Sequence, residues 1–247
     1  MAGSGSHPGD HAMDKIHRPH YQPIFQMNDV MLGVEVYLLP AELAASLPNQ
    51  QYETQIKLLR HGLLHVMSDL DSLVRLDVKR LFITISELHL DHARDLLGFL
   101  GERCQELGMV LVAQVDVAQR AEAMDAHPVV CRLLSQGGQL ALDGYGHYGN
   151  SFFQIVATLP SYVKLDTVFL RWCYESKFHG ALKDVVRLLE NFNCQIIVNG
   201  PETALQMQFA YTAGVKYVQG NLLCAPLEID RLVDEMTAVR VAVNEVA

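Results

Sequence analysis

Polar side chains stand at the ends of short apolar segments throughout this sequence, and their types could bind a divalent cation or another polar ligand. They are Glu35, Thr84, Gln114, Asp143, Lys164, Asn199 and Gln219. Carboxylate and amide oxygens are the ligands that Mg²⁺ and Ca²⁺ prefer, whereas a lysine among acids forms an ion pair with them. Whether these residues form one site depends on the elements that carry them.

Strand-like and helix-like patterns alternate along the chain. Two strands are predicted at 21–25 and 30–38, joined by a turn, and further strands at 81–86, 110–115, 139–142, 162–165, 194–198 and 215–218. Helices are predicted at 52–67, 91–107, 128–135, 150–158, 168–191, 202–213 and 227–246. About eight such units in about 230 residues predict an α/β fold, a (β/α)8 TIM-type barrel with one antiparallel strand near the N-terminus. Functional groups of such barrels lie at the carboxyl ends of the strands, which is where these polar residues fall.

The composition favours one globular domain. The chain has 247 residues, 50% of them hydrophobic, and a net charge of −9, which argues against direct binding of nucleic acid. Its five cysteines are widely spaced and form no CxxC pair, so the sequence indicates neither a zinc site nor a disulfide framework. A reducing, cytoplasmic location is expected.

The first residues differ in kind from the rest. Residues 1–20 are rich in Gly, Ser, His, Asp and Pro, and we predict a disordered leader, tag or linker there, followed by the barrel domain at 21–247. No apolar run is long enough to span a bilayer. The segment nevertheless raises the alternative that this is the cytoplasmic domain of a longer, membrane-anchored protein.

Several short motifs occur in a characteristic order and spacing. They are Glu35-Val36-Tyr37, Thr84-Ile85-Ser86, Gln114-Val115-Asp116-Val117, Asp143-Gly144-Tyr145-Gly146, Lys164-Leu165-Asp166, Asn199-Gly200-Pro201-Glu202 and Gln219-Gly220. Together they resemble the EAL family of cyclic-di-GMP phosphodiesterases, from about residue 21 to residue 226. The resemblance implies an EAL-like barrel whose intact members use two Mg²⁺ or Mn²⁺ ions on the top face to hydrolyse a phosphodiester.

This chain departs from the family pattern where ligands are expected. The phosphate-contacting arginine is Leu39, and the metal-ligand positions carry Thr84, Gln114, Gly144 and Asn199, of which Gln114 keeps an oxygen but no charge. The remnant site is Glu35, Asp143, Lys164, Asp166, Glu202 and Gln219. Only three of the expected ligand carboxylates remain, Glu35, Asp143 and Glu202. Opposed by Lys164, they do not readily hold two divalent cations, so we expect no metal, no cofactor and no catalytic residue.

Other features have simpler interpretations. His61 and His65 lie four apart on a predicted helix, but no third ligand is evident, so an ordinary helix face is favoured over a metal site. His147 is the one histidine inside a motif loop, and an ordinary loop position is favoured there over a contact with a phosphate. The aromatic residues around Trp172 and Phe178 fit either core packing or an interface.

The resemblance and its gaps lead to a hypothesis about function. We expect a catalytically inactive EAL-like domain that serves as a bacterial regulatory module through contacts with a protein partner, in cyclic-di-GMP-related or post-transcriptional regulation. The alternative is a sensor that binds cyclic-di-GMP without cutting it, and the third hypothesis is a weak metal-dependent phosphodiesterase. Relatives also suggest a homodimer as a further assembly.

Overall fold

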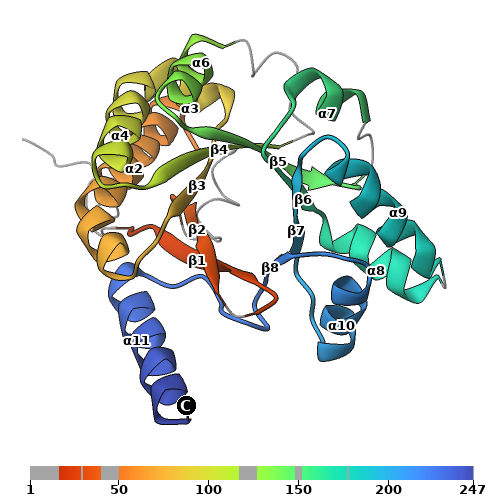
Figure 1. The fold of residues 1–247 in the computed structure, drawn as a ribbon. Coiled ribbons are helices and arrows are strands. Elements are labelled where there is room, and N and C mark those ends of the chain that lie inside the picture. The colour runs from red at the N-terminus through yellow and green to blue at the C-terminus, as the bar shows by residue number, and fades with distance from the viewer. Residues whose placement is uncertain are drawn as a thin grey trace, which may run out of the picture.

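The computed structural model describes residues 17–28, 30–39, 50–116, 127–147, 152–176 and 178–246. Within them, eight strands close into a barrel in the order of the sequence, and helices surround it (Figure 1). The strands are β1 (His20–Gln26), β2 (Met31–Tyr37), β3 (Arg80–Thr84), β4 (Val110–Asp116), β5 (Gln139–Tyr145), β6 (Tyr162–Leu165), β7 (Gln195–Asn199) and β8 (Tyr217–Gln219). The predicted TIM-type barrel is therefore confirmed.

The pairing of β1 is the exception in an otherwise parallel sheet. It runs antiparallel to both β2 and β8, whereas every other neighbouring pair is parallel. The predicted antiparallel strand near the N-terminus is thus confirmed. Because β1 is reversed, its first residue, His20, pairs with Tyr37 at the carboxyl end of β2 and lies on the same face of the barrel.

Helices cover the outside of the barrel (Figure 1). They are α2 (Tyr52–Arg75), α3 (Glu87–His92), α4 (Arg94–Glu106), α6 (Pro128–Ser135), α7 (Phe152–Thr158), α8 (Thr167–Glu175), α9 (His179–Glu190), α10 (Ala204–Thr212) and α11 (Ile229–Val246). Two of the predicted helices were wrong as single elements. The segment 91–107 breaks at Ala93, whose backbone is not helical (φ −122°, ψ 14°), and the segment 168–191 breaks after Glu175.

The last helix starts against the barrel and then leaves it. Ile229 and Leu232 are buried, and Met236 is half-buried against the core. Beyond this first part, α11 extends away from the body of the barrel (Figure 1). No helix in the described ranges combines the length and apolar character that crossing a bilayer requires.

Side chains inside the barrel are stacked in layers, because successive residues of a strand face opposite sides of the sheet. The apolar layer, as we call it, consists of Ile24, Leu32, Phe82, Val112, Ala141, Tyr162 and Ile197, all buried. The alternate positions, such as Leu81 and Ile83 on β3, belong to the larger core that includes the helices. The same alternation determines which residues face the interior nearer the carboxyl ends of the strands.

Candidate functional site

A polar layer lies directly above the apolar one, toward the carboxyl ends of the strands. On β3 to β7 its members follow an apolar-layer residue by two positions, so they face the same interior. The polar layer consists of Gln22, Glu35, Thr84, Gln114, Asp143, Lys164, Asn199 and Gln219. Of these, Gln22, Glu35, Gln114, Lys164 and Gln219 are buried. The fold thus gathers in one place residues that the sequence scatters over most of its length.

Glu35 is the centre of this layer and accepts hydrogen bonds from four side chains. Lys164 Nζ (2.9 Å), Gln219 Nε2 (2.7 Å) and the Tyr37 hydroxyl (2.9 Å) donate to Oε2, and Gln114 Nε2 (2.6 Å) donates to Oε1. A carboxylate offers about four lone-pair positions. Three donors of the protein itself therefore lie within hydrogen-bond distance of Oε2 and one within that distance of Oε1.

Gln114 bridges the two acidic residues of the layer through its nitrogen. Its Nε2 lies 2.6 Å from Glu35 Oε1, 2.9 Å from Asp143 Oδ2 and 3.2 Å from Thr84 Oγ1, so its two hydrogens are shared among three acceptors. Its oxygen is buried without a hydrogen-bond partner in the described structure. The sequence showed that Gln114 keeps an oxygen, but in the fold the donor end of its amide faces the carboxylates.

Charges in the layer are set by burial and by one buried ion pair. Burial would raise the pKa of Glu35, but Lys164 and the donated hydrogen bonds outweigh it and lower that pKa. Burial would lower the pKa of Lys164, but Glu35 and Asp143 raise it. Both groups are therefore charged at neutral pH, which places a buried salt bridge where the sequence had suggested one.

Asp143 is held less tightly than Glu35. Burial raises its pKa, and Lys164, 3.7 Å from Oδ1, only partly compensates. Its Oδ1 also accepts a hydrogen bond from the backbone N–H of Gly144 (2.8 Å). Gly144 itself has a φ of +72°, a conformation that glycine adopts without the steric penalty of a side chain. The second aspartate of the motif is thus replaced by a residue that suits a left-handed backbone.

The other predicted site residues lie outside this network. Asp166 caps α8 by accepting from the Val168 N–H at 2.7 Å, and His147 Nδ1 is 3.7 Å from its carboxylate. Glu202 is exposed and pairs with Arg171 at 3.1 Å. The structure therefore brings together Glu35, Thr84, Gln114, Asp143, Lys164 and Gln219, but it places Asp166 and Glu202 at the rim.

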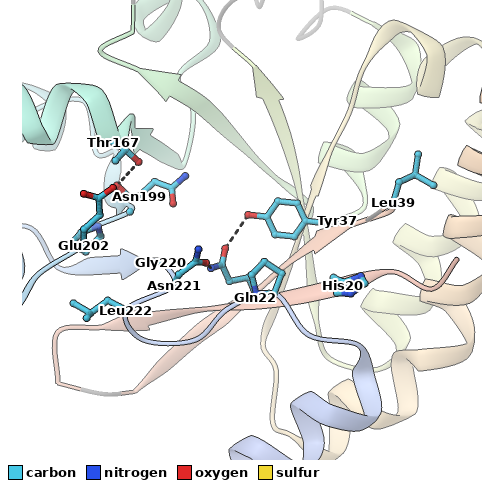
Figure 2. A pocket seen from close by; sticks show the side chains of 13 residues that line it. His20, Gln22, Tyr37, Leu39, Thr167, Asn199, Glu202, Gly220, Asn221 and Leu222 are labelled. Atoms are coloured by element: carbon cyan, nitrogen blue, oxygen red, sulfur yellow. Dashed lines mark hydrogen bonds between the residues drawn. The ribbon is translucent and has the colours of Figure 1, made fainter. Parts of the chain in front are cut away.

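An open cleft of about 1050 Å³ lies over the polar layer. Its lining is His20, Gln22, Tyr37, Leu39, Thr167, Asn199, Gly200, Pro201, Glu202, Gly220, Asn221, Leu222 and Pro226. Figure 2 shows Tyr37 pointing toward Gln22, with Leu39 and His20 at one end and Asn199 and Glu202 at the other. No lysine or arginine belongs to this lining in the described part of the chain.

Sequence analysis missed two residues of the site, Tyr37 and Gln22. The Tyr37 hydroxyl lies within hydrogen-bond distance of both Glu35 and Gln22 Oε1 (3.0 Å), and Gln22 Nε2 donates to the carbonyl of Cys224 (2.9 Å). Tyr37 sits between the cleft and Glu35. Period-two alternation along β2 already places Tyr37 on the same face as Glu35, and this was the available signal.

The histidine and aromatic features remain separate from this site. His61 and His65 contact each other edge to face, with ring centroids 4.5 Å apart on α2. Phe169, Trp172 and Phe178 stack along the start of α8 and beyond it, and Trp172 is 50% exposed. Across the described ranges, no three His, Cys, Asp or Glu side chains are grouped closely enough to hold a metal ion.

Comparison with known families identifies the barrel. The EAL domain family matches residues 13–226, and the chain therefore belongs to this family. A curated relative, the probable cyclic di-GMP phosphodiesterase PdeD of Escherichia coli (strain K12), is 26% identical over 118 residues. That match covers 47% of this chain and only 22% of the relative.

Solved structures share the fold at low sequence identity. The EAL enzyme Bd1971, in its form bound to cAMP and cyclic-di-GMP, has a TM-score of 0.76 at 16% identity, with 92% of this chain and 66% of that chain covered. The PaMucR phosphodiesterase in complex with c-di-GMP has a TM-score of 0.70 at 21% identity, with 90% of this chain and 96% of that chain covered. The EAL domain of FimX from Pseudomonas aeruginosa, bound to c-di-GMP, has a TM-score of 0.67 at 20% identity, with 89% of this chain and 94% of that chain covered.

Proposed function

We propose that this EAL domain is a non-catalytic regulatory module that works by binding a protein partner, in cyclic-di-GMP-related or post-transcriptional regulation in bacteria. The observation that carries the proposal is that Gln114, at a position where the intact motif has an acid, donates to Glu35, which also accepts from Lys164, Gln219 and Tyr37. A cation at Oε2 would have to displace one of these donors, and a cation at either oxygen would stand close to the buried Lys164 ammonium.

The replaced ligand positions support the same conclusion. An intact site would surround its cations with carboxylate and amide oxygens. Here position 144 offers no side chain, and Gln114 presents its donor nitrogen to Glu35 and Asp143. Lys164 belongs to the motifs that are intact here, so it is the loss of acids at positions 114 and 144, together with the donor that Gln114 supplies, that weakens the site for two cations.

Hydrolysis is the direct test of this proposal. The chain is incubated with cyclic-di-GMP and Mn²⁺, and linear product is measured by chromatography beside the PaMucR phosphodiesterase as a positive control. We expect no product above that formed by Glu35→Ala. Turnover that Glu35→Ala abolishes would support the third hypothesis, a weak phosphodiesterase, and would overturn the non-catalytic assignment.

A sensor of cyclic-di-GMP is the second candidate, and the open cleft above the polar layer favours it. The EAL domain of FimX and the PaMucR phosphodiesterase have each been solved with c-di-GMP bound. Leu39 and the other described lining residues offer no cationic side chain for its phosphates. We therefore expect calorimetry, with and without Mg²⁺ or Ca²⁺, to show no micromolar binding, and micromolar affinity would move the sensor to first place.

A further inference from the structure

The lining of the cleft has a chemistry that differs from that of a phosphate site. The amide side chains of Gln22, Asn199 and Asn221 are prominent in its polar part, beside two hydroxyls and one imidazole. Leu39, Leu222 and Pro226 add apolar surface, and Glu202 is the one carboxylate among the described lining residues. Phosphate sites are built from arginine, lysine or converging backbone N–H groups. From this contrast we propose that the cleft binds an extended polypeptide segment of a partner protein, in which an apolar side chain lies beside a lysine or arginine.

Two asparagines support recognition of a peptide backbone. The Asn199 side chain is half-buried in the cleft and makes no hydrogen bond to any residue that the structure describes, so both its N–H₂ donor and its oxygen acceptor are available. Asn221 Oδ1 accepts from Gln22 Nε2 at 3.2 Å, which leaves its own N–H₂ group available. A primary amide can pair with both the N–H and the C=O of a peptide group.

Apolar surface is positioned to take a side chain of the same segment. Leu222 lines the cleft and is 48% exposed. Leu39 stands at the opposite end of the cleft in Figure 2. An aliphatic or aromatic side chain of the partner seated against Leu222 would bury apolar surface of both chains, and that is the larger part of the expected affinity.

The charge of the cleft indicates which residue of the partner should stand beside its apolar side chain. Glu202 is exposed at the rim and pairs with the exposed Arg171, in a contact open to exchange with a partner's cation. The whole chain has a net charge of −9, and no cationic side chain lines the described cleft. A basic residue on the partner is therefore attracted, whereas an acidic one or a phosphate is repelled.

This inference rests on the proposed non-catalytic function and names the partner chemistry of the same site. The test uses a phage-displayed library of random dodecapeptides, selected on the whole chain. An enriched peptide is then synthesised with a fluorophore and titrated by anisotropy. We expect enriched sequences to pair an apolar residue with Lys or Arg, and we expect Asn199→Ala and Leu222→Ser each to weaken binding about tenfold.

Matched variants make the result decisive. Leu64→Ser, on the exposed face of α2 and 53% exposed, changes the same residue type away from the cleft and should bind as the wild type does. Glu202→Gln should weaken the binding of peptides that carry a basic residue by a few fold. Enrichment of acidic sequences, binding unaffected by Asn199→Ala and Leu222→Ser, or the absence of any enriched peptide would overturn the inference. The turnover assay tests the proposed function separately. A partner that bound elsewhere on the barrel would overturn this inference but would leave the proposed function standing.

Discussion

The two interior layers of the barrel are built on the same strands, yet they are stabilised in different ways. In the apolar layer, residues such as Phe82 and Tyr162 pack edge to face, with ring centroids 5.1 Å apart. In the polar layer, two positions further along the same strands, Thr84 and Lys164 join a network of hydrogen bonds and charges centred on Glu35. One layer depends on excluded water and close packing, and the other on hydrogen bonds and ion pairs among groups that are costly to bury.

The difference bears on how the fold would hold without bound metal, as the proposed function requires. An apolar layer tolerates small changes of volume at modest cost. A buried carboxylate must instead be compensated by a cation, a metal or hydrogen-bond donors. Here Lys164, Gln114, Gln219 and Tyr37 provide that compensation for Glu35, so removing one of them should cost more than trimming the apolar layer.

The largest expected effect comes from Lys164→Met, which leaves the buried Glu35 and the half-buried Asp143 without their cation. We predict a loss of about 3–5 kcal/mol in the free energy of unfolding, measured by urea titration, as for other broken buried ion pairs. The matched control is Lys216→Met, which removes an exposed pair with Glu190 and should cost about 0–1 kcal/mol. Equal losses for the two variants would contradict the distinction between the layers.

Gln114→Glu should have the next largest effect, because it turns a bridging donor into a third acid. A carboxylate would then stand where an amide nitrogen lies 2.6 Å from Glu35 and 2.9 Å from Asp143. We predict a loss of about 1–3 kcal/mol at neutral pH, from the lost donor and the new repulsion, and partial recovery when Mn²⁺ is added.

Gln206→Glu is the control for that variant. Gln206 is also buried, but its oxygen accepts from the Glu202 N–H at 2.7 Å, and a carboxylate can keep that bond. We expect a smaller loss and no recovery with Mn²⁺ in thermal unfolding. If Gln114→Glu were as stable as the wild type without metal, the bridging role of the amide would be wrong.

Ile197→Val tests the apolar layer with a smaller expected effect. It removes one methylene group from a fully buried side chain, and such changes cost about 0.5–1.5 kcal/mol. Because no charge is involved, the difference from the wild type should be the same at every pH at which the chain folds. Urea titrations at two pH values measure this, and a loss that varied with pH would tie the apolar layer to titrating groups.

Asp143→Asn should show the smallest difference and a dependence on pH. The folded-state pKa of Asp143 is raised above its ordinary value of 3.8, mainly by burial, so its ionisation disfavours the folded state as pH rises through that folded-state pKa. Asparagine lacks this effect. The stability of Asp143→Asn relative to the wild type should therefore improve between about pH 4 and pH 7 in urea titrations. A relative stability that fell over this interval would contradict the assignment.

Much of the fold could be predicted because local patterns specify it. Alternating apolar segments and the turn after residue 26 gave every strand within a few residues, including the antiparallel β1. The break at Ala93 could not be predicted, since alanine is the strongest helix former and no glycine or proline marks the place. There the chain turns to keep α3 and α4 on the barrel, which is a tertiary requirement.

The sequence predicted which residues form the candidate site better than it predicted how they contact one another. Strand ends identified Glu35, Gln114 and Lys164, and the barrel assembles them. Their roles depend on contacts between residues far apart in the sequence, such as the bond from Gln219 to Glu35 across 184 positions. Only the closed barrel shows which end of the Gln114 amide faces the two acids. The same holds for the position of Tyr37 between Glu35 and the cleft.

The central claim is that the protein's own donors occupy Glu35 in place of a metal, and Mn²⁺ titration followed by electron paramagnetic resonance tests it most directly. Free aqueous Mn²⁺ gives a sharp signal that is lost on binding. We predict that the signal with the wild-type chain matches that with Glu35→Ala over the whole titration. Loss of two equivalents of Mn²⁺ signal per wild-type chain, restored by Glu35→Ala, would contradict the account.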